Sequence, residues 1–202
     1  MNRSAPLPKL LASIAVIAAA ASIAGLGTYA TFTSSTAAET QALTSGTVSI
    51  ALGSVNRLAV GASNLVPGDT VERAVDLTND GSAGTSQVGS ISLGITASPS
   101  SLLDTDTTNG LQMVIDKCSA AWTEAGPPYT YTCGGSTSTV LASRAVIGSS
   151  LSLSNLSSTT AGATDHLRVT LTLPGAAPNS LQNQSSTISY AFTGTQRAAT
   201  NK

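Results

Sequence analysis

The chain has 202 residues and a formal net charge of −1, and only 9% of its residues are charged. This length suffices for one ordinary domain and scarcely for two. Because neutralising phosphates requires clustered lysine and arginine, and the basic residues here are few and dispersed, nucleic-acid binding is not expected. The low charge, together with many threonine, valine, isoleucine and leucine residues, favours β-sheets over helices, whose exposed faces usually carry charged side chains.

The N-terminal segment has the pattern of an export signal. Arg3 and Lys9 supply a positive start, and residues 10–26 are almost entirely apolar. Small residues follow, which suits cleavage by a signal peptidase between Ala30 and Thr31. An uncleaved membrane anchor is the alternative, because an apolar run of this length lies at the short end of the range that spans a bilayer. The sequence therefore predicts a secreted or surface protein that contacts the membrane only through an uncleaved signal.

The segment after the signal has a weaker alternation of apolar and polar residues than the rest of the chain. It is polar and rich in small residues, and it predicts either a tail or an edge strand that awaits a partner. We therefore expect four parts: a signal peptide (1–30), an N-terminal segment (31–46), a β-sandwich domain (47–196) and a C-terminal tail (197–202).

Alternation of apolar and polar residues recurs along the chain and predicts strands with one buried face. It is cleanest at Leu167–Leu173 and weaker at Val71–Leu77, where Arg73 falls on the apolar face. In chain order, the alternating stretches are Val48–Leu52, Val71–Leu77, Ile91–Ile95, Leu111–Ile115, Leu151–Leu153, Leu167–Leu173 and Ile188–Phe192. Turn signals rich in glycine, proline, asparagine and aspartate separate them. The sequence predicts an all-β fold, a jelly-roll-like antiparallel β-sandwich of about seven to nine strands, preceded by a helical signal peptide.

Cys118 and Cys133 are the two cysteines of the chain, and both follow the predicted signal. In an oxidising compartment such a pair is expected to form a structural disulfide. A redox or metal-ligating pair is less favoured, because the C-x-x-C spacing and histidine partners are missing. Trp122, Tyr129 and Tyr131 lie between the cysteines, and we expect them to pack beneath the loop; a patch that contacts a glycan or a partner is the alternative.

Residues that could support catalysis are sparse. The single histidine, His166, falls on the polar face of the clearest strand, where a solvated side chain is expected. Asp104 and Asp106 stand in a stretch with a faint likeness to a calcium loop, but a polar surface turn is favoured because the closing glutamate and the flanking helices are missing. We predict no catalytic residue, no metal site and no cofactor. A hidden hydrolase site would have to use Asp104, Asp106, Asp116, Glu124, Asp165 and His166.

Several motifs, taken in order, resemble the TasA/camelysin family of secreted biofilm-matrix proteins. The resemblance spans nearly the whole chain, and four motifs in the right order make it more specific than any one alone. The matching stretches are Gly27–Thr33, Leu43–Ile50, Leu65–Val71 with Leu77–Ser82, and Ala161–Val169 with Leu181–Gln196.

The resemblance implies a jelly-roll domain that is exported through a dedicated, SipW-type signal peptidase. It also implies homo-oligomers or extracellular fibres, in which the freed N-terminal segment of one subunit completes the sheet of a neighbour. The candidate donor residues here are Phe32, Ala38, Ala42 and Leu43. A monomeric surface or adhesive module is the alternative function. The metalloprotease activity associated with the name camelysin is not expected, because the usual ligand spacings are missing.

Overall fold

The computed structural model describes residues 33–35, 51–52, 60–81 and 88–198 of the chain. The chain divides into two compact units, residues 1–31 and 32–202, and all described residues belong to the second unit. The predicted signal peptide, the cleavage position at Ala30 and Thr31, and the candidate donor residues lie outside the described residues. Within the described ranges, no helix is long and apolar enough to cross a membrane.

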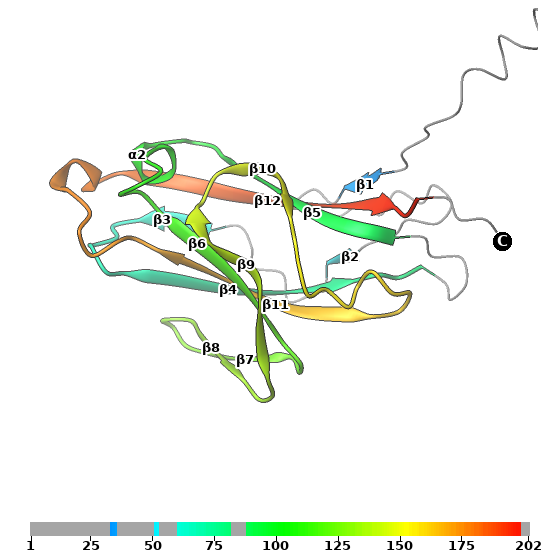
Figure 1. Cartoon of the computed structure of the whole chain (residues 1–202). Helices are drawn as coiled ribbons and strands as arrows, with labels where there is room; N and C mark the ends of the chain where they lie inside the picture. Colours follow the sequence, from blue (N-terminus) through cyan, green and yellow to red (C-terminus); the bar gives the residue numbers. More distant parts are fainter. Residues whose placement is uncertain (1–32, 36–50, 53–59, 82–87, 199–202) are drawn as a thin grey trace, which may run out of the picture. The chain divides into compact units, whose positions relative to one another are not determined.

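The second unit is built from two five-stranded antiparallel sheets, drawn in Figure 1. The first sheet consists of β1 (Thr33–Ser35), β3 (Val60–Ser63), β12 (Ser185–Gln196), β5 (Val88–Ala97) and β10 (Gly148–Ser152). The second consists of β2 (Ala51–Leu52), β4 (Thr70–Thr78), β11 (Thr164–Thr172), β6 (Gln112–Cys118) and β9 (Thr137–Ala145). A separate hairpin, β7 (Trp122–Ala125) and β8 (Thr130–Cys133), lies beyond the second sheet in Figure 1.

The core is formed by the apolar sides of both sheets. On β11, Leu167, Val169 and Leu171 are buried and alternate with half-buried polar residues, as the sequence pattern predicts. On β12, Ile188 and Phe192 are fully buried in the same way. These residues belong to one hydrophobic cluster, so the predicted all-β sandwich is confirmed.

The described residues contain twelve strands, more than the seven to nine expected. β1, β7 and β8 have only three or four residues, too few for an alternation to be recognised. β9 is longer, but its pairing with β6 contains two register irregularities, which interrupt the two-residue period. Two short helical turns, α2 (Leu102–Thr105) and the 3₁₀ turn η1 (Asn179–Leu181), complete the fold.

Candidate functional site

One side of β12, in the first sheet, has a gap between its described strand neighbours. Its other side pairs with β5 along most of its length. On the first side, β3 pairs with residues 185–188 and β1 pairs with residues 193–195. Residues 189–192 therefore have a described strand neighbour only on the β5 side. A strand edge of this kind offers backbone hydrogen-bonding groups to an added extended segment.

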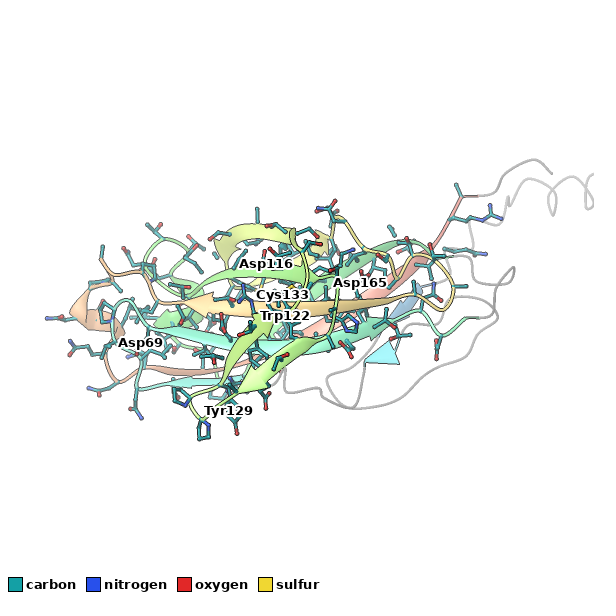
Figure 2. The ribbon with its side chains drawn as sticks, turned by 90° about the horizontal axis from the view of Figure 1, so that it is seen from below. Asp69, Asp116, Trp122, Tyr129, Cys133 and Asp165 are labelled. Atoms are coloured by element: carbon teal, nitrogen blue, oxygen red, sulfur yellow. A yellow bond between two sulfur atoms is a disulfide. The ribbon has the colours of Figure 1, made fainter. Side chains whose placement is uncertain are left out.

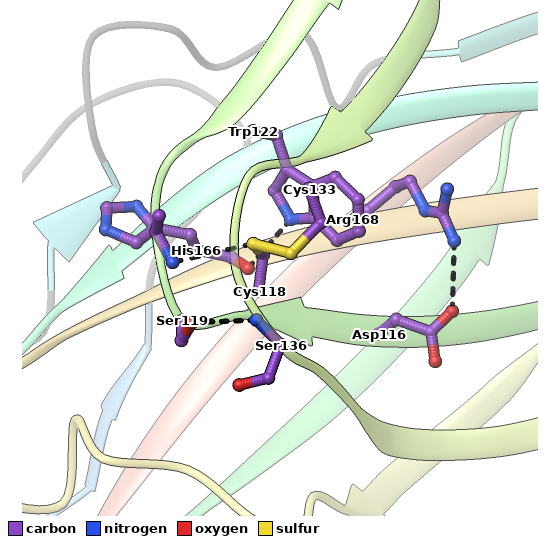
Figure 3. The surroundings of a disulfide bond; sticks show 9 residues. Asp116, Cys118, Ser119, Trp122, Cys133, Ser136, His166 and Arg168 are labelled. Carbon is purple, nitrogen blue, oxygen red and sulfur yellow. Dashed lines mark hydrogen bonds and ion pairs between the residues drawn. A yellow bond between two sulfur atoms is a disulfide. The ribbon is translucent and has the colours of Figure 1, made fainter.

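The disulfide predicted between Cys118 and Cys133 is present, with the two Cα atoms 5.7 Å apart. It joins the end of β6 to the end of β8, as Figure 3 shows. The bond fastens the hairpin to the second sheet, because Cys118 lies beside His166 of β11 in the strand register. The predicted structural disulfide is therefore confirmed.

The hairpin lies across the outer face of the second sheet, where Figure 2 shows Trp122 and Cys133 over the sheet. The Trp122 indole N–H donates a hydrogen bond to the His166 backbone oxygen at 2.9 Å. The Arg168 guanidinium carbon lies 4.5 Å from the centre of the Trp122 ring, a cation–π contact. Tyr131 is 7% exposed and the Tyr129 ring lies 5.5 Å from the guanidinium carbon of Arg73, so all three loop aromatics help to hold the hairpin on the sheet.

Tyr131 also connects the hairpin to β4. Its backbone N–H donates to Glu72 Oε2 at 3.2 Å, and its phenol donates to Glu124 Oε2 at 2.6 Å. Burial and the nearby Glu124 carboxylate raise the pKa of Tyr131 to about 12, since both oppose the charged phenolate. Arg168 pairs with Glu72 at 3.2 Å and with Asp116 at 3.3 Å, so one guanidinium joins carboxylates of β4 and β6 beneath the hairpin.

His166 lies on the outer face, as predicted, but it is not simply solvated. Its Nδ1 is 2.6 Å from Asp76 Oδ1, and its side chain is 25% exposed. The reason is the register of the sheet, which places His166 of β11 directly opposite Asp76 of β4. The expectation of a solvated histidine is corrected: the ring is held by a cross-strand partner.

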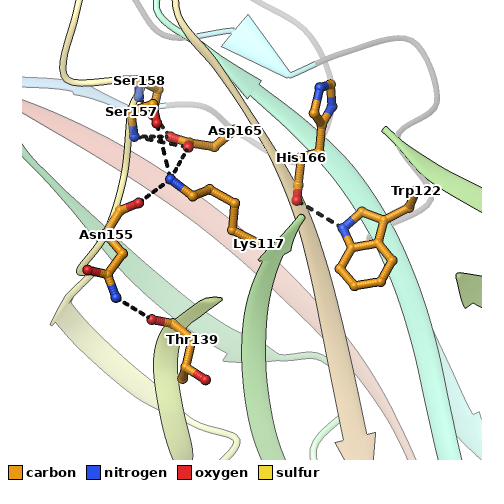
Figure 4. A network of polar contacts seen from close by, with 8 residues as sticks. All are labelled: Lys117, Trp122, Thr139, Asn155, Ser157, Ser158, Asp165 and His166. Atoms are coloured by element: carbon orange, nitrogen blue, oxygen red, sulfur yellow. Dashed lines mark hydrogen bonds and ion pairs between the residues drawn. The ribbon is translucent and has the colours of Figure 1, made fainter. Parts of the chain in front are cut away.

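Asp165 is the acidic residue of the polar network in Figure 4. It is buried, with 1% of the residue exposed. Its carboxylate accepts hydrogen bonds from the backbone amides of Ser157 and Ser158 and pairs with Lys117 Nζ at 3.1 Å. Lys117 also donates to the backbone oxygen of Asn155. Burial by itself would raise the pKa of the Asp165 carboxyl, but these hydrogen bonds together lower it. The loop after β10 is thereby tied to β6 and β11.

Asp104 and Asp106 have local structural roles around the short helix α2. Asp104 accepts hydrogen bonds from Ser100 Oγ and from the backbone N–H of Ser101, completing a capping box. Burial alone would raise the pKa of Asp104, but its hydrogen bonds, including one from Ser186, lower it. Asp106 accepts from the backbone and the side chain of Asn109, and these bonds lower its pKa. This arrangement favours the polar turn over the calcium loop.

The six residues named for a hidden hydrolase site are engaged in separate structural contacts. Asp104 and Asp106 lie at α2, Asp165 is inside the loop network, and Glu124 is bonded to Tyr131 in the hairpin. Asp116 pairs with Arg168, and His166 with Asp76. In the part of the chain that the structure describes, no three histidine, cysteine or acidic residues are grouped so that they could hold a metal ion. The described donor set therefore does not fit a metal centre.

Sequence reasoning missed the pairing of Asp165 with Lys117 and of His166 with Asp76. Both depend on the register between strands that are distant in sequence. The capping box of α2 did leave a recognisable signal, a serine followed three residues later by an aspartate.

Comparison with known proteins gives one match. The sequence pattern that defines the camelysin metallo-endopeptidase family matches residues 7–107, which is half of the chain. The matched stretch includes β1 to α2 and ends before the disulfide-closed hairpin. No curated protein and no solved structure matches the chain.

Proposed function

The chain belongs to the camelysin metallo-endopeptidase family, and on that premise we propose that it is an exported structural protein of the cell surface or extracellular matrix. Its copies would assemble by strand addition, with the segment 31–46 of one copy pairing with β12 of the next. The observation that supports this proposal is the place of β1. In the single chain it pairs with Thr193–Thr195, on the side of β12 that β5 leaves open.

Exchange of this strand between copies is physically plausible because little pairing has to be broken. β1 pairs with β12 over three residues. A neighbour's segment would remake the same backbone hydrogen bonds, as in domain swapping, where an identical element replaces its own copy. A longer extended segment would also pair with residues 189–192, between the positions of β3 and β1. These added bonds would offset part of the entropy lost on association.

Signal cleavage between Ala30 and Thr31 would act as the switch for assembly. While the segment is attached to an uncleaved signal in the membrane, it cannot reach a neighbouring copy. The few apolar side chains that the donor offers to the recipient sheet would come from Phe32, Ala38, Ala42 and Leu43.

We propose a structural rather than a catalytic role for the described residues because their ionisable side chains are engaged in structural contacts. His166 is bonded to Asp76, Asp104 caps a helix, and Asp165 holds a loop. Both cysteines are used in the disulfide.

Electron microscopy of the chain from residue 31, with and without residues 31–44, tests the proposal. Fibres are expected only when the segment is present. A second variant, Ser34→Pro, keeps the length but removes a backbone N–H from β1, so it should form fewer fibres. Persistent monomers in every sample, across salt and pH, would reject assembly and favour the monomeric surface module.

A further inference from the structure

The second sheet has an edge that could compete for an added strand. β4 pairs with β11 over nine residues. On its other side, β2 pairs only with Leu77 and Thr78, so residues 70–76 have no described strand neighbour there. A long, open edge of this kind normally invites pairing with another chain, and proteins protect such edges with charged side chains or with a covering segment.

The hairpin contacts this stretch of β4 directly. Arg73 Nη1 donates a hydrogen bond of 2.6 Å to the backbone oxygen of Glu72, and the Tyr131 backbone N–H donates to the Glu72 carboxylate. The Arg73 guanidinium carbon lies 5.5 Å from the centre of the Tyr129 ring. β8, the strand that carries Tyr131, lies against β4. Arg73 thus occupies one backbone oxygen that an incoming strand would need, and the hairpin holds the Arg73 and Glu72 side chains in place.

The hairpin could not hold this position through its own pairing. Its two strands have four residues each, and an isolated two-stranded hairpin is marginally stable at best. The Cys118–Cys133 bond and the hydrogen bond from Trp122 to the His166 backbone fasten it to the sheet. These two attachments lie on β6 and β11. These strands therefore fix the position of the hairpin beside β4.

We propose that the disulfide-closed hairpin is an edge guard: it covers the outer edge of β4, so that the N-terminal segment of a second copy of this chain is kept from β4 and adds to β12. The excluded strand comes from the proposed function, so this inference rests on it. The consequence is one competing acceptor edge fewer per subunit, which favours unbranched fibres over sheets or branched aggregates.

The guard is tested first without assembly, through amide hydrogen exchange along residues 70–76 of β4 in the chain from residue 31, followed by NMR. Cys118→Ser/Cys133→Ser releases the hairpin from its covalent attachment and should accelerate exchange in this stretch several-fold more than in β5, which reports any general loss of stability. The matched control Ser119→Ala removes one hydrogen bond next to the disulfide but keeps the bond, so exchange along β4 should stay near the wild-type rate. Equal acceleration in β4 and β5 of the double serine variant would overturn the proposal.

The second test uses a fluorescent peptide with the sequence of residues 31–46. The wild-type chain should take up peptide at β12, and Cys118→Ser/Cys133→Ser should take up one further copy, at β4. Circular dichroism checks that the variant is folded. Equal uptake by both proteins contradicts the guard. If the wild type takes up none, the proposed function fails, and the exchange rate along β4 still decides whether the edge is guarded.

Discussion

Removing the disulfide should destabilise the protein in a way that starts at the hairpin. The variant Cys118→Ser/Cys133→Ser opens a loop with a sequence separation of 15 residues. In the chain-entropy description, the unfolded chain then gains freedom that corresponds to about 3 kcal/mol of stability. The hairpin keeps the Trp122 hydrogen bond and ring contact, which contribute about 1 kcal/mol each. We expect these contacts to be too weak to hold it during denaturation.

The assay uses the only tryptophan of the chain as a reporter. Trp122 lies in β7, so its fluorescence follows the hairpin, whereas far-ultraviolet circular dichroism follows the two sheets. In urea, the two signals should change together for the wild type, as in a cooperative transition. For the double serine variant, the fluorescence change should come at lower urea than the loss of sheet structure.

Two results would refute this reasoning. One is a loss of stability below about 1 kcal/mol, which is well short of the loop-entropy value. The other is coincidence of both signals in the variant. Ser119→Ala serves as the control, because it removes one hydrogen bond of 3.0 Å from the Ser136 backbone in the same loop. It should lower stability by about 1 kcal/mol or less and keep the signals together.

Three further predictions follow from the buried polar groups and from the packing near α2. Asp165→Asn should lower stability at neutral pH by about 3 kcal/mol, since it removes the buried carboxylate that pairs with the half-buried Lys117 and accepts from two backbone amides; the hydrogen bonds lower the folded pKa of Asp165, so the difference should shrink as pH falls through that folded value. Tyr131 should ionise late in an absorbance titration, and its contribution to stability should be complete below pH 10 and lost as pH rises through about 12. Gly110→Ala should destabilise by about 1–3 kcal/mol in urea denaturation, because an added Cβ would lie 2.4 Å from the Asp106 backbone oxygen.

Each of these has an outcome that contradicts it. For Asp165→Asn, the comparison is Asp116→Asn, a partly exposed ion pair that should lose about 1 kcal/mol or less; equal losses would argue against the buried network. For Tyr131, a loss of the absorbance change near pH 10 in Tyr131→Phe would show that this tyrosine ionises at its usual pKa. For Gly110→Ala, wild-type stability would mean that the turn accommodates a side chain.

The sequence predicts the strands in which apolar and polar residues alternate, because this alternation can be recognised along a single segment. Leu167, Val169 and Leu171 alternate because one face of β11 meets the core, and this pattern needs no knowledge of the neighbouring strands. Arg73 weakens the same pattern on β4. The structure explains the exception, since β4 is an edge strand there and the guanidinium contacts the Tyr129 ring.

Features that depend on register between distant strands could not be predicted in the same way. Asp165 looks like a surface residue in the sequence, yet it is buried because Lys117 of β6 and two backbone amides of the preceding loop converge on it. The gap on one side of β12 cannot be read from the local sequence either. It follows from the pairing of distant strands, since among the described residues β1 and β3 pair only with two separate parts of β12.

Cysteine cross-linking in assembled material tests strand exchange most directly. Ser35 and Thr193 are register partners of β1 and β12, so Ser35→Cys/Thr193→Cys should form a new disulfide at that pairing. The control Ser35→Cys/Thr187→Cys is out of register, because Thr187 is opposite Gly61 of β3. If copies exchange the strand, a non-reducing gel of the first variant should show a ladder of covalent oligomers that the control lacks. Cross-linked monomers alone, at protein concentrations where assemblies are present, would contradict strand exchange.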